Sequence, residues 1–222
     1  GSSAHMCGGT FDGDGHTITV TYNTTSDNVG PFCYVDNATI RNLHVAGSIT
    51  TTMRYAGGLL SNCYNNMVIE NCRSSVSITT NYGGDATCGG IIAVSHGTTF
   101  VTGCLFDGTF ARTNGAYNCG GLAGWIDNGT TRSEEIVQGK SVIDNGTTAT
   151  FTDCLFAPAA LAEGMLQKTL ARGIQTLIFN NCYYTTAAGD VQGEQAWSVT
   201  GTPDMTLALA GMPANTYSVS GL

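Results

Sequence analysis

The chain has 222 residues and a formal net charge of −8 at pH 7, from 16 acidic and eight basic side chains. So few basic residues exclude a nucleic-acid-binding face, which needs Lys and Arg to neutralise phosphates. The sequence also has no run of 18 apolar residues, the length that a membrane-spanning helix needs. The 30 glycines, with abundant Thr, Asn and Ser and few strong helix formers, indicate a β-protein with many tight turns.

The N-terminal segment divides into a tag and a turn. Residues 1–6 are typical of a purification tag and cloning scar, so we exclude them from the fold and expect the rest to belong to a larger polypeptide. Asp12-Gly-Asp14-Gly-His16 superficially resembles a calcium loop, but the further oxygen ligands and the distal Glu of that motif are missing. We interpret it as a turn before a strand at Thr17, and we expect no metal site and no cofactor.

A short pattern then recurs five times: an extended apolar stretch, a small polar residue, one Cys or Leu, and further apolar residues. The copies have this Cys or Leu at Leu43, Cys72, Cys104, Cys154 and Cys182, at intervals of 29, 32, 50 and 28 residues. The first four copies are preceded by a second mark, one or two glycines followed by mostly apolar residues, at Gly30, Gly57-Gly58, Gly89-Gly90 and Gly120-Gly121. Self-similarity at about 30 residues predicts a repeat architecture.

The apolar residues within each repeat alternate or come in short runs that end at Gly, Asn or Asp, which favours strands of three to six residues over helices. Because backbone groups need partners, each strand is expected to pair with its equivalent one repeat along, about 4.8 Å away. The sequence therefore predicts an all-β protein, a right-handed parallel β-helix of five or six coils over residues 7–190. Residues 191–222 are expected to form an extension packed on this β-helix or capping it.

Two segments interrupt the repeat. The interval of 50 residues carries an insertion downstream of Trp125, and because Ile126-Asp-Asn-Gly-Thr-Thr131 recurs as Ile143–Thr148, the hairpin-like insert is expected at 132–148. Residues 159–171 contain good helix formers and could form a short lateral helix. They also occupy the interval where one more coil belongs, so we favour irregular extended structure there.

Nine cysteines, an odd number, follow the repeat and lack the close Cys and His spacing of a zinc site. The column of Cys72, Cys104, Cys154 and Cys182 is expected to face the core as reduced thiols. Cys88 and Cys119 each precede a glycine doublet and form a second column, so they are the candidates for a disulfide. The polar residues before the first column could form a side-chain ladder or could be ordinary turn residues: Asn42, Asn71, Asp153 and Asn181.

The candidate ligand-binding residues lie at the insert and near the glycine corners. The insert contains four charged residues, and long loops that leave a repeat scaffold often form binding surfaces. The alternative is a solvent-exposed hairpin that has no function of its own. Tyr117 and Trp125, among other aromatic residues at Tyr55, Tyr64 and Tyr82, could form a platform for sugar rings or could cap the core. The four charged residues of the insert are Arg132, Glu134, Glu135 and Lys140.

No catalytic residue is predicted. Ser95-His96 places a hydroxyl beside an imidazole, but neighbours on a strand point to opposite faces, and no orienting acid or oxyanion donor is identifiable. Several carboxylates are present, yet no pair with the separation that glycoside hydrolysis needs follows from the sequence.

Thr10-Phe-Asp-Gly-Asp-Gly-His-Thr-Ile18, Val29-Gly-Pro-Phe-Cys-Tyr-Val35 and Ala38-Thr-Ile-Arg-Asn-Leu-His-Val45 together resemble the opening of GLUG-motif β-helix domains, and the later Gly-Gly-Leu and Asn-Cys copies match the core of that motif. The resemblance implies a module of a secreted or cell-surface bacterial protein, adhesin-like, which binds a host glycan or surface protein or serves as a spacer. It implies no catalytic residues. The alternatives are a carbohydrate-active enzyme, such as a polysaccharide lyase or glycosidase on the same scaffold, and an accessory domain of a surface peptidase.

Overall fold

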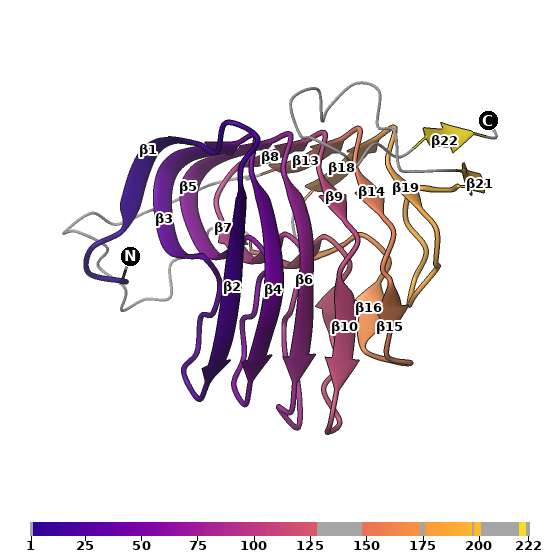
Figure 1. The fold of residues 1–222 in the computed structure, drawn as a ribbon, viewed down its shortest axis with the longest axis horizontal. Helices are drawn as coiled ribbons and strands as arrows, with labels where there is room; N and C mark the ends of the chain where they lie inside the picture. Colours follow the sequence, from indigo (N-terminus) through magenta and orange to yellow (C-terminus); the bar gives the residue numbers. More distant parts are fainter. Residues whose placement is uncertain (1, 128–147, 174–175, 197, 201–217, 221–222) are drawn as a thin grey trace.

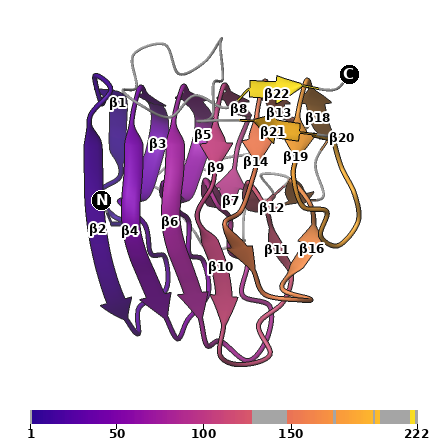
Figure 2. The same ribbon diagram turned by 45° about the vertical axis from the view of Figure 1, so that its right-hand side comes forward.

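The computed structural model describes residues 2–127, 148–173, 176–196, 198–200 and 218–220, and in these residues it contains strands and turns without a helix (Figure 1). The chain winds through about five turns of a parallel β-solenoid, which confirms the predicted fold class. Successive coils lie side by side from the N-terminal end to the C-terminal end, so that each strand is covered by its equivalent in the next coil (Figure 2).

Two nine-stranded sheets form the walls of the solenoid. The first sheet contains β1 (Cys7–Asp12), β3 (Phe32–Arg41), β5 (Leu60–Glu70), β7 (Ile92–His96), β8 (Thr99–Thr102), β12 (Ala123–Ile126), β13 (Thr148–Thr152), β17 (Ala171–Gly173) and β18 (Thr176–Asn180). The second sheet contains β2 (Thr17–Thr24), β4 (His44–Thr51), β6 (Arg73–Thr80), β9 (Leu105–Phe106), β10 (Thr109–Arg112), β14 (Leu155–Phe156), β15 (Ala160–Leu161), β19 (Tyr183–Tyr184) and β20 (Glu194–Gln195).

Shorter pairings complete the fold. β11 (Cys119–Gly120) pairs in parallel with β16 (Leu166–Lys168), on the side where the glycine marks stack. β21 (Ser198–Thr200) and β22 (Ser218–Ser220) form an antiparallel pair. β20 adds a parallel strand to β19, so residues 194–195 of the C-terminal extension continue the second sheet.

Residues 159–171 are extended, as favoured from the repeat, and they contain β15, β16 and the start of β17. β15 pairs with β10 and β17 pairs with β12, so this segment supplies the walls of a coil in spite of its helix-forming composition. Tertiary pairing with the coil before it outweighs local propensity here. The insert expected at 132–148 lies outside the described residues, apart from Thr148 in β13.

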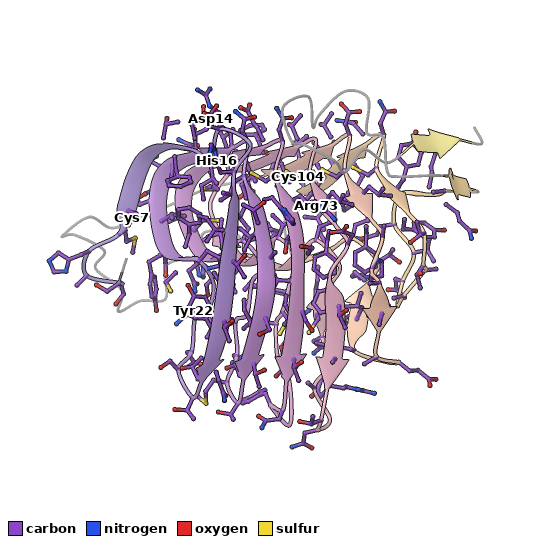
Figure 3. All side chains as sticks on the ribbon, in the orientation of Figure 1. Cys7, Asp14, His16, Tyr22, Arg73 and Cys104 are labelled. Atoms are coloured by element: carbon purple, nitrogen blue, oxygen red, sulfur yellow. The ribbon has the colours of Figure 1, made fainter. Side chains whose placement is uncertain are left out.

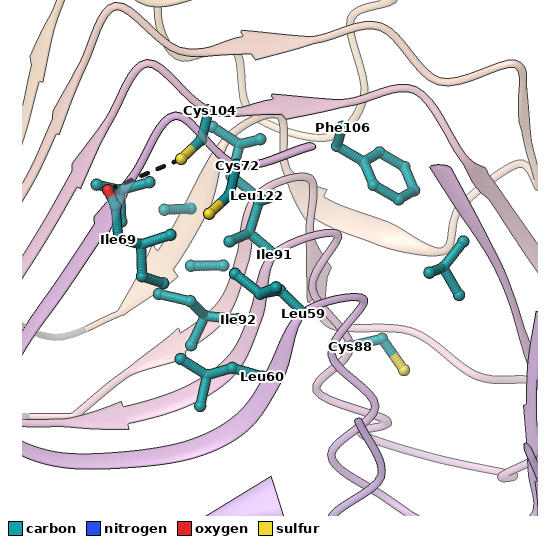
Figure 4. Packing of buried hydrophobic residues seen from close by; sticks show 14 of the residues in the cluster. Leu59, Leu60, Ile69, Cys72, Cys88, Ile91, Ile92, Cys104, Phe106 and Leu122 are labelled. Carbon is teal, nitrogen blue, oxygen red and sulfur yellow. Dashed lines mark hydrogen bonds between the residues drawn. The ribbon is translucent and has the colours of Figure 1, made fainter. Parts of the chain in front are cut away.

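Alternation along the strands separates the core from the outer faces. In β4 the inward residues Val45 and Ile49 are fully buried, and in β6 the buried Ile78 lies in register with Ile49 and the buried Val76 with Gly47. The corner beside β7 stacks Leu59, Ile91 and Leu122 in another column (Figure 4). Phe106 and Phe156 stack with ring centroids 5.8 Å apart. One continuous core therefore runs along the solenoid axis.

β3 and β5 run to 10 and 11 residues, longer than the three to six expected, because each bends and then resumes pairing with the same strand after a shift in register. The bend is at Asn37 in β3 and at Asn65 in β5, with φ of 48° and 56°. Both are Asn, which tolerates the left-handed region better than other residues with a side chain. In the next coil Gly97 takes this place, since a Cβ there would collide with the backbone of Asn65.

A second left-handed corner joins the first sheet to the second sheet. The residue before the Cys column has φ between 49° and 61° in every coil after the first, at Asn42, Asn71, Gly103, Asp153 and Asn181. Its amide donates a hydrogen bond to the next coil: Asn42 N to Glu70 O at 3.0 Å, Asn71 N to Thr102 O at 2.9 Å, Gly103 N to Thr152 O at 2.9 Å and Asp153 N to Asn180 O at 2.9 Å. We call this set the corner amides. Because the coils share one backbone conformation at this corner, each corner amide finds a carbonyl oxygen of the next coil as its hydrogen-bond acceptor.

The side chains at the same corner form a ladder in two pieces. Asn71 Nδ2 donates to Asn42 Oδ1 at 3.4 Å, and Asn42 Nδ2 donates to Asp12 Oδ1 at 3.0 Å. Asn181 Nδ2 donates to Asp153 Oδ1 at 3.1 Å. Gly103 has no side chain and separates the pieces, so the side-chain ladder, one of the two alternatives that the sequence left open, is present on either side of it.

The Cys column lies inside this corner. Cys72, Cys104, Cys154 and Cys182 are at most 3 % exposed, which confirms their predicted burial. Each thiol lies near two carbonyl oxygens, one two residues back and one in the preceding coil; Cys104 Sγ is 3.4 Å from Thr102 O and 3.8 Å from Ile69 O (Figure 4). A thiol thus fills a small apolar position and donates weakly to the corner backbone.

The glycine doublets mark where two parts of the backbone meet too closely for a side chain. A Cβ at Gly90 would fall within 3.0 Å of the Phe106 ring and of the Gly121 carbonyl oxygen, and neither neighbour is the end of a flexible side chain. Gly115, on a loop, has no atom within 4 Å of the place where a Cβ would lie. The doublets are therefore required by coil spacing, whereas the loop glycine is not.

We predict that Gly90→Ala lowers the free energy of unfolding by about 1–3 kcal/mol, because the added methyl overpacks the core against Phe106 and a neighbouring coil. Gly115→Ala is the matched control and should stay within about 0.5 kcal/mol of wild type. Urea unfolding followed by circular dichroism measures both. Equal stability of the two variants would contradict the close approach of the coils at Gly90.

Candidate ligand-binding site

Tyr117 and Trp125 lie on the side of the solenoid where the glycine marks stack. Tyr117 forms a parallel bridge with Asp85 in the preceding coil and is 46 % exposed. Trp125 lies in β12 and is half-buried. The register of β12 with β17 places Arg172 beside Trp125, and the guanidinium carbon lies 4.5 Å from the centroid of the indole ring. This distance is that of a cation–π contact.

Arg172 also donates two hydrogen bonds to Asp85, at 3.1 Å from Nη1 to Oδ1 and 3.0 Å from Nη2 to Oδ2. Its Nη1 donates further to the carbonyl oxygen of Asn118. The Arg172 side chain is only 12 % exposed and that of Asp85 is 32 % exposed. One guanidinium therefore connects segments 87 residues apart in the sequence with the bidentate geometry that makes Arg–carboxylate pairs strong.

The other oxygen contacts of Asp85 complete this joint. Thr87 Oγ1 donates to Asp85 Oδ1 at 2.7 Å, and Arg54 Nη2 lies 3.8 Å from Oδ2. Arg54 Nε donates to the Asp85 carbonyl oxygen at 3.0 Å, and its guanidinium lies over Tyr55, 5.0 Å from the ring centroid. We call Arg54, Asp85, Trp125 and Arg172 the arginine joint.

Partial burial of Asp85 raises the pKa of its carboxyl, but the hydrogen bonds from Arg172 and Thr87 and the charges of Arg172 and Arg54 outweigh that effect, so the pKa is below its ordinary value. The carboxylate stays ionised near neutral pH. It is suited to hold Arg172 in place, and it is a poor proton donor.

The arginine joint has an aromatic residue at two of its contacts. One face of the Trp125 ring is covered by the Arg172 guanidinium, whereas Tyr117, directly before Asn118, is exposed. An exposed ring on a rigid backbone can bury apolar CH groups of a ligand with little loss of side-chain entropy. This arrangement can bind a ligand, and its polar groups orient rather than transfer protons.

The remaining candidate residues do not join this surface. Tyr64 is 8 % exposed and stacks on His96 with ring centroids 4.7 Å apart, and Tyr82 packs against the core. The four charged residues expected to bind ligand from the insert lie outside the described residues: Arg132, Glu134, Glu135 and Lys140. Their role stays a prediction.

Sequence reasoning missed Arg172 and Asp85 as partners of the aromatic residues. A usable signal was present in the repeat, since the sequence around Trp125 and the sequence around Arg172 occupy equivalent stretches of neighbouring coils. Their pairing depends on the extended path of residues 159–171, which the sequence left open between helix and strand.

Ser95 and His96 point to different sides of β7, as expected for neighbours on a strand. Ser95 is fully buried and its Oγ lies 2.6 Å from Thr99 Oγ1. His96 instead stacks on Tyr64 and places Nδ1 3.4 Å from Asp127 Oδ2. The two side chains therefore do not form a nucleophile–base pair.

The Asp12–His16 segment is a turn. Asp12 Oδ1 accepts a hydrogen bond from the Asp14 amide at 3.0 Å, and Asp14 and His16 lie at the turn that leads into β2 (Figure 3). Among the described residues, no group of three or more His, Cys, Asp or Glu side chains could hold a metal ion.

All nine cysteines are free thiols in this structure, and seven of them are buried. Cys88 and Cys119 stack in neighbouring coils as expected, and the Cys88 amide lies 3.3 Å from Cys119 Sγ. A disulfide between them stays a prediction. Burial raises the pKa of Cys63 to about 12, and burial likewise raises the pKa values of Cys104 and Cys119 well above the ordinary thiol value.

The protein is a parallel β-solenoid with an exposed aromatic residue, Tyr117, beside the arginine joint. The chain matches no family model, no curated protein and no solved structure. Within the described ranges, no helix has the length and apolar character to cross a bilayer.

We predict that only Cys7 and Cys33 react with a thiol reagent in the native protein, Cys7 first, because Cys7 is exposed and Cys33 is half-buried. Cys7→Ser should remove the fast phase. Unfolding without reductant should release nine thiols, or seven if Cys88 and Cys119 are oxidised to a disulfide (9 − 2 = 7). Fast native reaction of more than two thiols would contradict the burial of the Cys columns.

We predict that Asp85→Asn destabilises the protein at pH 7 by about 1.5–3 kcal/mol, the range for hydrogen bonds to charged groups. Since the folded pKa of Asp85 is below the unfolded value of about 3.9, its contribution is present above about pH 5 and is lost as the pH falls through the unfolded and then the folded pKa. Urea midpoints from pH 6 to pH 3 should therefore fall less steeply in Asp85→Asn and in Arg172→Met than in wild type. Identical slopes in all three proteins would contradict the joint.

Proposed function

We propose that this chain is a non-catalytic, adhesin-like module of a secreted or cell-surface bacterial protein, and that it binds a host glycan through Tyr117 beside the arginine joint. The observation that carries the proposal is the exposed Tyr117 ring, held directly before the Asn118 carbonyl that Arg172 binds. Rigid placement favours binding, because little conformational entropy is lost when the ligand docks.

The charged groups at the site are engaged within the joint. Arg172 and Arg54 share the one carboxylate of Asp85, and both guanidinium groups also donate to backbone carbonyl oxygens. A ligand that meets Tyr117 therefore finds an aromatic face bordered by polar groups, which suits a ring that offers CH groups on one face and hydroxyls at its edge.

Binding is favoured over hydrolysis at this site. Glycoside hydrolysis needs one carboxyl group that donates a proton, and the carboxylate of the joint, Asp85, is kept ionised by its hydrogen bonds with Arg172 and Thr87. A carbohydrate-active enzyme with an acid pair elsewhere and an accessory domain of a surface peptidase are the competing proposals.

Membership of the GLUG-motif family is part of this proposal. Its support is that the two recurring marks of the sequence stack in columns, the glycine doublets through the bridges Gly57–Gly89 and Gly89–Gly120 and the Cys residues at the left-handed corner. A surface location and attachment to a larger polypeptide rest on this resemblance.

A glycan array with the folded chain tests the proposal. We expect binding to at least one host glycan, and we expect Tyr117→Ala to weaken it about tenfold, which corresponds to about 1.4 kcal/mol. Phe100→Ala is the matched control, because Phe100 is an aromatic residue of similar exposure, 44 % against 46 %. It should leave binding unchanged. Absence of binding by the folded chain, or equal loss in both variants, would overturn the proposal, and release of shortened product would identify an enzyme instead.

A further inference from the structure

The outer face of the second sheet carries a regular array of small hydroxyl side chains. Its middle row runs across four strands in unbroken parallel register, through Thr21, Ser48, Ser77 and Thr109. All four are exposed or half-buried, and they alternate with the buried inward residues of the same strands. The strands β2, β4, β6 and β10 lie side by side and evenly spaced (Figure 2).

The neighbouring rows have the same character. One consists of Asn23, Thr50, Thr79 and Ala111, and the other of Thr19, Ala46 and Ser75. These eleven positions, which we call the hydroxyl face, include no charged and no aromatic residue, although the chain has a net charge of −8. In the next coil Asp107 continues the row of Ser75, and its amide donates to the Ser74 carbonyl oxygen at 3.1 Å. Arg73 lies at the start of β6, outside these rows, and its charge is paired with Asp107, with side chains 10 % and 8 % exposed (Figure 3).

The array is periodic in two directions. Neighbouring strands of a sheet are about 4.8 Å apart, and successive outward residues of one strand are about 6.7 Å apart. Ser and Thr lose little rotamer freedom when their hydroxyl groups are held, and their positions here are fixed by a sheet whose other side is packed core. A rigid lattice of donors and acceptors matches only a partner that is itself flat, neutral and periodic.

We propose that the hydroxyl face binds the surface of ice. Ice is a neutral, flat lattice of hydrogen-bonding oxygens that repeats every few ångströms and cannot adapt its shape. A charged side chain must keep its hydration shell, which the lattice does not accommodate, so the charge-free rows satisfy a condition that the rest of this acidic chain does not. The methyl groups of Thr and Ala order water between the hydroxyls.

Other occupants fit this face less well. A glycan gains most of its affinity from aromatic stacking and charged hydrogen bonds, and the hydroxyl face has neither an aromatic nor a charged residue. A second copy of the chain would need a more apolar patch, because stable homodimer interfaces resemble a core cut in half. This inference is independent of the glycan site at Tyr117.

Thermal hysteresis and inhibition of ice recrystallisation by the full chain test the proposal. We expect both activities in wild type and loss of most of each in Ser77→Tyr, in which a ring in the middle row lifts the face from the lattice. Thr39→Tyr is the matched control, because Thr39 is half-buried on the outside of the first sheet. It should keep both activities. Tyr is a strand former at outward positions, and circular dichroism melting verifies that both variants fold.

Three results would overturn the proposal. The first is a folded wild-type chain without hysteresis or recrystallisation inhibition. The second is equal loss in the two variants. The third is concentration-dependent dimerisation, or binding of a neutral glucan, that Ser77→Tyr abolishes and Thr39→Tyr preserves, since this would give the face a different occupant.

Discussion

The structure depends on one constraint: every coil must follow the same path as the coil beneath it, at the spacing of a β-sheet. A parallel solenoid satisfies its backbone groups only through neighbouring coils. The corners are where this is most difficult, because the chain must turn and still present an amide to the coil above. A left-handed residue solves the problem at each turn, and the corner amides then continue the hydrogen bonds of the strands through the bend.

The same constraint explains the residues that recur. The residue before the Cys or Leu of the first column is Asn or Gly in every coil except the one with Asp153. Asn and Gly recur there because they tolerate positive φ. The Cys residues fit where the inward side chain must be small and where nearby carbonyl oxygens accept a weak donor. The glycine doublets lie where a Cβ would strike a neighbouring coil. The repeated pattern is therefore a record of coil geometry.

Function follows where the repeat leaves room for variation. Arg172 and Asp85 join a loop and a later coil, and this joint is specific to those two positions rather than repeated. The hydroxyl face arises in the opposite way, because three coils and part of a fourth keep small polar residues at equivalent outward positions. A β-solenoid thus has two kinds of surface: a local one formed by residues that do not recur between coils, and an extended one formed by similar residues at equivalent positions of successive coils.

The features of the fold that repeat from coil to coil can be predicted from the sequence, whereas the features that occur once cannot. The spacing from Leu43 to Cys182 is sufficient to predict the parallel solenoid and the burial of the Cys column, because both are set by equivalence between coils. It favoured an extended path for residues 159–171 without excluding a helix. The bends at Asn37 and Asn65 were not predicted, since each Asn has a polar neighbour, Asp36 or Asn66, and the sequence does not distinguish a bend from outward polar positions of a strand. The pairing of Arg172 with Asp85 was not predicted either, because it depends on how two side chains of different coils meet in space.

Hydrogen exchange of the corner amides, followed residue by residue by NMR, tests the central claim most directly. If in-register stacking holds the fold together, the amides of Asn42, Asn71 and Gly103 should exchange as slowly as strand amides of the same coils, because each donates to the next coil at 2.9–3.0 Å. Corner amides that exchange as fast as those of exposed loops, while the strand amides remain protected, would contradict the account.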